Sequence, residues 1–116
     1  MTTYQGSLTN EDYHLLIEKK NIHSKNFNKN QIQPSSIDLT LSEECYEISA
    51  SFLSSSANIR ENLKDIMIEK INLEKNYVFK KNKIYLVRLN EIINLPHDIF
   101  GFCNLCSWFL CAFLFW

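Results

Sequence analysis

The chemically most suggestive residues of this sequence are two cysteines separated by two other residues. Cys103 and Cys106 have the spacing at which paired thiolates hold zinc. Zinc held in this way can activate a water molecule that deaminates a nucleobase, provided that a His-x-Glu segment supplies a third ligand and a proton carrier. None of the three histidines, His14, His23 and His97, is followed two positions later by glutamate. The sequence therefore predicts no zinc.

Other common catalytic motifs are missing from the sequence. Its two glycines, Gly6 and Gly101, cannot build a Gly-rich phosphate-binding loop or a Gly-x-Ser-x-Gly elbow. The four cysteines are expected to be free thiols in a reducing cytosol, where cysteine behaves as a small apolar residue. ATPase, dinucleotide-binding and elbow-type hydrolase functions are therefore disfavoured.

Charge and length exclude further classes. The chain has 116 residues, with 12 Lys plus Arg against 13 Asp plus Glu, and its net charge of −1 suggests no electrostatic grip on nucleic acid. One domain of this size is expected. Residues 1–10 resemble neither a secretory signal nor a transit peptide, so a cytoplasmic location is the default prediction.

The first element that could position a site is a short helix. Thr9 is placed to accept a hydrogen bond from the backbone of Asp12, while Leu8 and Tyr13 can form a hydrophobic staple. The helix is expected to end near residues 20–21, where Asn21 can adopt the left-handed conformation.

Most of the remaining elements are predicted to be strands. Apolar residues alternate with polar ones at Ile37, Leu39 and Leu41, and again from 45 to 53, which predicts a second strand or a bent continuation of the first. Residues 54–56 are expected to form a loop. The sequence then predicts a helix capped by Asn58, an extended stretch at Ile71 and Leu73, a hairpin of residues 77–80 and 83–90, and extended residues 92–96.

The C-terminal 12 residues differ in composition from the rest of the chain. Ser107 is the one polar residue between Leu105 and Trp116, and a membrane-spanning helix needs about 20 apolar residues. Two interpretations are open: an aberrant apolar tail, from a frameshift or a chimeric end, and a buried C-terminal element. The first is favoured because a soluble domain would have to hide five large aromatic side chains together.

One stretch resembles a known family. Residues 31–41, with the sequence QIQPSSIDLTL, resemble the first signature of the dCTP deaminases, which are related to the dUTPases. Residues 50–53 (ASFL), 85–87 (YLV) and 95–99 (LPHDI) match the longer bacterial form in the same order. The resemblance covers roughly residues 7–104, so residues 1–104 are assigned to the N-terminal part of such a domain and residues 105–116 to the tail. The family's Pro-Lys-Ser-Ser-Thr-Gly-Arg segment would follow Asn104, and it does not stand there.

The resemblance implies a mainly β fold: an incomplete, distorted dUTPase-like β-barrel of the β-clip or jelly-roll type, with one or two short helices. It implies a homotrimer if the domain is complete, with dCTP or dUTP bound between subunits and Mg²⁺ accompanying the triphosphate. Asp38 is the one site residue carried over, as a nucleotide- or phosphate-binding group near the magnesium. A polar strand residue bonded to the neighbouring loop is an equal alternative. Ser35 and Ser36 are assigned to the turn before this strand.

The function implied by the resemblance is hydrolytic deamination of dCTP to dUTP and ammonia, in dUTP and thymidylate supply. The Ser, Arg and Glu residues that carry this chemistry in the family are expected beyond the break near residue 104, so the chain as given is expected to be truncated and inactive. The alternatives are a dUTPase-like triphosphate hydrolase and a non-catalytic β-barrel fragment. A small membrane-attached protein that uses its aromatic tail is a third class, but the leading interpretation involves neither a membrane nor nucleic acid.

Overall fold

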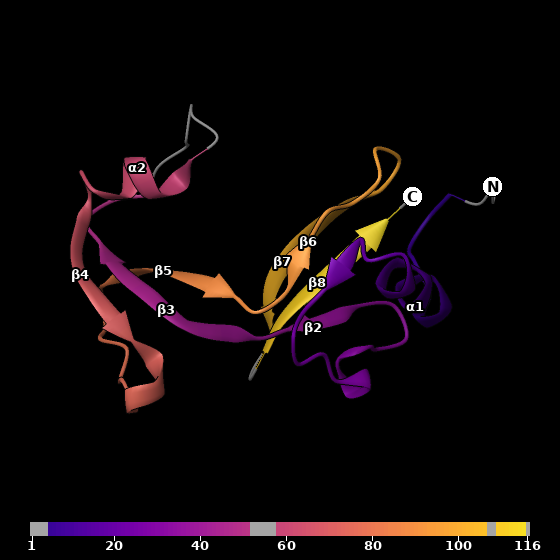
Figure 1. Cartoon of the computed structure of the whole chain (residues 1–116), viewed down its shortest axis with the longest axis horizontal. Helices are drawn as coiled ribbons and strands as arrows, with labels where there is room; N and C mark the ends of the chain where they lie inside the picture. The colour runs from indigo at the N-terminus through magenta and orange to yellow at the C-terminus, as the bar shows by residue number, and fades with distance from the viewer. Residues whose placement is uncertain (1–4, 52–57, 107–108, 116) are drawn as a thin grey trace. The chain divides into compact units, whose positions relative to one another are not determined.

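The fold is mainly β, as predicted, with two short α-helices and antiparallel strand pairs. The computed structural model describes residues 5–51, 58–106 and 109–115 (Figure 1). Two compact units divide the chain, one of residues 1–40 with 89–116 and one of residues 41–88. The helices are α1 (Asn10–Glu18), α2 (Ile59–Leu63) and the short 3-10 turns η1 (Lys29–Gln31) and η2 (Leu73–Lys75). The strands are β1 (Ile22–His23), β2 (Ile37–Leu39), β3 (Leu41–Ile48), β4 (Met67–Asn72), β5 (Ile84–Leu89), β6 (Ile92–Ile93), β7 (Phe100–Cys106) and β8 (Phe109–Phe115).

Helix α1 begins at the predicted N-cap, where Thr9 and Asp12 form a capping box. The backbone nitrogen and the hydroxyl of Thr9 both donate to the Asp12 carboxylate, at 2.8 and 3.0 Å, which fixes the first turn. Leu8 and Tyr13 are both fully buried and anchor the helix to the core. The prediction for the C-terminal end was wrong in detail, because Lys20, not Asn21, takes the left-handed conformation, with φ of 61°.

The first unit contains a two-stranded sheet of β1 and β6 and a three-stranded sheet in the order β2-β8-β7. Figure 1 shows β8 lying between β2 and β7. Strand β2 pairs with β8 so that Ile37 lies opposite Ala112 and Leu39 opposite Leu110. The core of this unit consists of Leu8, Tyr13, Leu16, Ile22, Ile37, Leu39, Ile99 and Ala112.

The C-terminal segment is an integral part of this sheet. Residues 109–115, which the sequence interpretation assigned to an aberrant tail, form β8 and pair along their length with β7. Ala112 is 2% exposed and belongs to the core. This strand is therefore placed as the alternative interpretation, a buried C-terminal element, predicted. The boundary at residue 104 and the origin of the tail stay predictions. None of the helices that the structure describes is long and apolar enough to cross a membrane.

The second unit is built on the sheet β4-β3-β5. Strand β3 begins at Leu41 and runs without interruption to Ile48, whereas the sequence predicted the second extended run at residues 45–53. Leu41 was predicted to share the buried face of Ile37, but it begins the new strand and is 48% exposed. The buried side of this sheet instead contains Cys45, Ile48 and Ile71.

The connections of the second unit follow the sequence in part. The Asn58 side chain accepts a hydrogen bond from the Arg60 backbone nitrogen at 3.1 Å, which caps α2 as predicted. Asn82, with φ of 62°, forms the turn before β5. Residues 77–80 were predicted to form the partner strand of a hairpin, but the structure gives them no strand pairing. The loop predicted at residues 54–56 lies outside the described residues.

Candidate functional site

Asp38 lies in the middle of β2, on the face opposite to its buried neighbours. Because side chains alternate along a strand, Ile37 and Leu39 enter the core while Asp38 remains half-buried. Its Oδ2 accepts a hydrogen bond from the Gln33 side chain at 3.1 Å. The carboxylate is therefore bonded to the preceding loop, as the alternative interpretation of Asp38 predicted.

The strand that carries Asp38 is held by a buried carboxylate. Glu91 is 6% exposed, and its Oε1 accepts from Gln31 Nε2 at 2.8 Å and from Thr40 Oγ1 at 2.7 Å. Its Oε2 accepts from the Thr40 backbone nitrogen at 3.0 Å. A buried carboxylate is tolerable only when its acceptor sites are filled in this way. Glu91 therefore connects the two ends of the segment that contains β2.

Gln31 holds the same segment, and we call the hydrogen bonds of Glu91 and Gln31 together the clamp around Asp38. Its amide nitrogen also donates to the Asp38 carbonyl at 2.9 Å, and its Oε1 accepts from the Asn28 backbone nitrogen at 2.9 Å. Both donors of the Gln31 amide are thus used inside the protein. Hydrogen bonds of Gln31 and Glu91 therefore hold both ends of residues 31–40, the segment that contains Asp38.

The remaining sequence-predicted residues lie elsewhere. The backbone carbonyl of Ser35 accepts a hydrogen bond from the Tyr13 hydroxyl at 3.3 Å. The backbone carbonyl of Ser36 accepts one from the Gln33 backbone nitrogen at 2.9 Å, as in a turn. Cys103 is exposed on β7. Within the described part of the chain, no three His, Cys, Asp or Glu side chains are grouped so that they could hold a metal ion.

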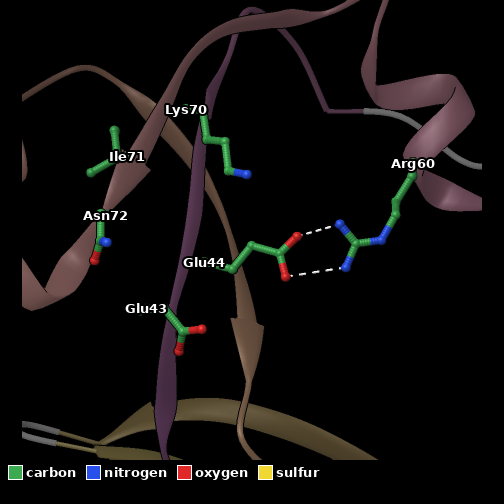
Figure 2. Close-up of a pocket in the computed structure, with 6 residues that line it drawn as sticks. All are labelled: Glu43, Glu44, Arg60, Lys70, Ile71 and Asn72. Carbon is green, nitrogen blue, oxygen red and sulfur yellow. Dashed lines mark hydrogen bonds and ion pairs between the residues drawn. The ribbon is translucent and has the colours of Figure 1, made fainter.

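The second unit contains a pocket that the sequence did not predict. Its volume is about 480 Å³, and strands β3 and β4 and helix α2 supply its lining. Figure 2 shows the Glu44 carboxylate facing the Arg60 guanidinium across the pocket. The lining residues are Glu43, Glu44, Arg60, Lys70, Ile71 and Asn72.

Glu44 is the electrostatic centre of this pocket. It accepts two hydrogen bonds from Arg60, one from the Tyr46 hydroxyl at 2.5 Å and one from Arg88 at 3.3 Å. The bonds from Arg60 and Tyr46 lower the pKa of Glu44 to about 2, against the opposing effect of burial. A carboxylate with so low a pKa is a poor general base near neutral pH. An ion-pair network around Glu44 therefore lines the pocket. Glu44 itself is unsuited to proton transfer near neutral pH.

Acid is expected to weaken the second unit through Glu44. Because the folded-state pKa lies below the ordinary value, folding favours the ionised form, and this stabilisation is complete above pH 4.5 and is lost as pH falls towards 2. Urea denaturation followed by circular dichroism should show a difference between wild type and Glu44→Gln that shrinks over this range. Glu43→Gln, which removes a lining carboxylate outside these ion pairs, is the control and should give the smaller difference at neutral pH. A constant difference for Glu44→Gln across the range would contradict the ion-pair assignment.

Comparison with known proteins adds the family context. Residues 4–108 match the family described as the 2'-deoxycytidine 5'-triphosphate deaminase (DCD) N-terminal domain. No curated protein sequence gives a significant match. Among solved structures, the fold is similar to that of the 2'-deoxycytidine 5'-triphosphate deaminase from Agrobacterium tumefaciens, with a TM-score of 0.72 and 20% sequence identity. The similarity covers 96% of this chain but 42% of the length of that one.

Proposed function

This chain belongs to the family of dCTP deaminase N-terminal domains, and from that premise we propose that it serves in the hydrolytic deamination of dCTP to dUTP and ammonia. In this reaction water adds to the ring carbon that bears the amino group, and ammonia leaves with the proton that the water gives up. The observation that carries the proposal is the family match over residues 4–108, which includes the clamped segment around Asp38.

We assign Asp38 to the magnesium triphosphate of the nucleotide. Mg²⁺ keeps most of its water, so a donor set of substrate phosphates and water molecules can include a carboxylate that contacts the ion through one of these waters. A single half-buried carboxylate, fixed on a rigid strand, suits this donor set. When bound, the ion would neutralise charge on the triphosphate. The contribution of this chain is orientation, since Gln31 and Gln33 hold the backbone and the carboxylate of Asp38 in place.

We also propose that the general-base glutamate and the Ser and Arg side chains of the reaction lie outside residues 1–104. In the described residues, the buried carboxylate of Glu91 is committed to structural hydrogen bonds and Glu44 to ion pairs. The 116-residue polypeptide alone is then expected to leave dCTP unchanged. Product analysis tests the proposal. Formation of dUTP by this polypeptide would contradict the placement of the catalytic side chains outside residues 1–104, and formation of dUMP with pyrophosphate would indicate a dUTPase-like hydrolase instead.

Binding tests the assignment of Asp38 without requiring turnover. Asp38→Asn is expected to weaken the affinity for magnesium dCTP about 10- to 100-fold, the effect of losing an outer-shell metal partner. Isothermal titration calorimetry with and without Mg²⁺ would measure it. Asp98→Asn, at an exposed position of the same unit, is the control and should bind as the wild type does. Equal affinities of Asp38→Asn and Asp98→Asn would refute the assignment.

A further inference from the structure

The second unit displays a group of aromatic rings beside a run of lysines. We call this group, Tyr77, Phe79, Tyr85, Lys80 and Lys81, the lysine–aromatic surface. All five residues come from the segment that leads into β5 and from the strand itself. None of them takes part in the pocket or in the clamp around Asp38. The deaminase proposal therefore leaves this surface without a role.

The three rings support one another at the surface. The ring centroids of Phe79 and Tyr85 lie 4.8 Å apart, and those of Tyr77 lie 5.8 Å from Phe79 and 6.0 Å from Tyr85, all in edge-to-face geometry. The Tyr85 hydroxyl accepts from the Lys80 backbone nitrogen at 2.9 Å and contacts the Tyr77 hydroxyl at 3.3 Å. Phe79 nevertheless remains 47% exposed. The result is a preformed apolar platform with ring surface available to a ligand.

The segment that carries the rings has an excess of positive charge, and the carboxylates of Glu47 and Glu69 also lie near enough to contribute to the raised pKa of Tyr77. Residues 74–83 contain four lysines and one glutamate, a net charge of +3, whereas the whole chain carries −1 and the rest therefore carries −4. Lys83 pairs with Glu47 at 3.4 Å, while Lys75, Lys80 and Lys81 form no ion pair among the described residues. The hydrogen bond with Tyr85 raises the pKa of Tyr77 to about 12, so the Tyr77 hydroxyl adds no negative charge near neutral pH.

We propose that the lysine–aromatic surface binds single-stranded nucleic acid. Its rings and its lysines match the bases and the phosphates of such a strand, because unpaired bases stack on aromatic rings while lysines neutralise phosphates. An acidic peptide would use the lysines but leave the exposed ring of Phe79 in water. An anionic bilayer is less well matched. The rings pack on one another and the two tyrosine hydroxyls are hydrogen-bonded, so the rings do not project as separate membrane anchors.

Fluorescence anisotropy with a labelled thymidine oligonucleotide of about 16 nucleotides tests this proposal on the whole chain. Binding should be saturable at low salt. A plot of the logarithm of the association constant against the logarithm of the salt concentration should have a slope of about −0.7 per phosphate contacted. Lys80→Glu with Lys81→Glu should reduce the affinity at least about tenfold and flatten the salt dependence. Lys25→Glu with Lys29→Glu, the same charge change at exposed lysines of the other unit, should leave the affinity within about twofold.

Stacking is tested separately from charge. Phe79→Leu keeps an apolar side chain but removes the ring, and it should weaken binding about 5- to 100-fold while circular dichroism shows an unchanged fold. Four results would overturn the proposal: absence of saturable binding, an equal loss in the two lysine variants, no effect of Phe79→Leu, or complete competition by anionic vesicles or by free dCTP at the same phosphate concentration. Deamination is tested apart from these results, since the products of dCTP are measured without the oligonucleotide.

Discussion

Replacement of Ala112 by aspartate is expected to remove much of the stability of the unit made of residues 1–40 and 89–116. Ala112 is 2% exposed, belongs to the core and pairs in register with Ile37. An unpaired charge at this position costs roughly 3–5 kcal/mol, comparable to breaking a buried ion pair, whereas a whole domain is stable by about 5–15 kcal/mol. Hydrogen exchange should show loss of protection for Ile37 and Leu39, whose strand depends on β8.

The same experiment decides between the two interpretations of the C-terminal segment. Asn104→Asp, which adds the same charge at an exposed position of β7, should retain the protection of the wild type. If Ala112→Asp is also as protected as the wild type, residues 109–115 do not form a core strand, and the interpretation as an aberrant tail is favoured.

Replacement of Glu91 by leucine is expected to be the second most damaging change. The substitution leaves Gln31 Nε2, the Thr40 backbone nitrogen and the Thr40 hydroxyl without their acceptor. A buried donor without an acceptor costs about 1–3 kcal/mol, and the two groups of the half-buried Thr40 add less each, so the free energy of unfolding should fall by about 2–5 kcal/mol. Urea denaturation measures this loss. Magnesium dCTP affinity should fall with it, because the clamp around Asp38 is opened.

Two further variants make this test specific. Glu91→Gln keeps one acceptor oxygen and should be intermediate in stability. Glu11→Leu removes an exposed carboxylate from α1 in the same unit and should be close to the wild type. Equal stabilities of Glu91→Leu and Glu11→Leu would show that the buried carboxylate does not hold β2.

The parts of the fold that sequence predicted correctly depend on neighbouring residues. Thr9 with Asp12, Leu8 with Tyr13, and Asn58 with Arg60 all interact within a few positions, so their patterns are visible in the printed sequence. The mainly β fold follows in the same way from short alternating runs.

The parts that could not be predicted depend on distant residues. Glu91 lies 51 positions from Thr40, and nothing beside it in the sequence marks it as buried. Leu41 continues the alternation of Ile37 and Leu39, yet it belongs to the next strand and is exposed. Residues 77–80 alternate like a strand but pair with no strand and supply two rings of the lysine–aromatic surface, because the whole fold determines which segments pair.

The order of the strands also has a consequence for biosynthesis. Strand β2 is made early, but its partner β8 comes from the last part of this sequence, and the unit of residues 41–88 is translated between them. Such long-range pairing is slow to form and leaves a strand edge open on the nascent polypeptide. The intervening unit can fold on the ribosome first, while β2 waits for its partner and is exposed to misassociation with other nascent chains. Chaperone dependence during translation should therefore be concentrated on residues 37–39, and it should end when β8 emerges.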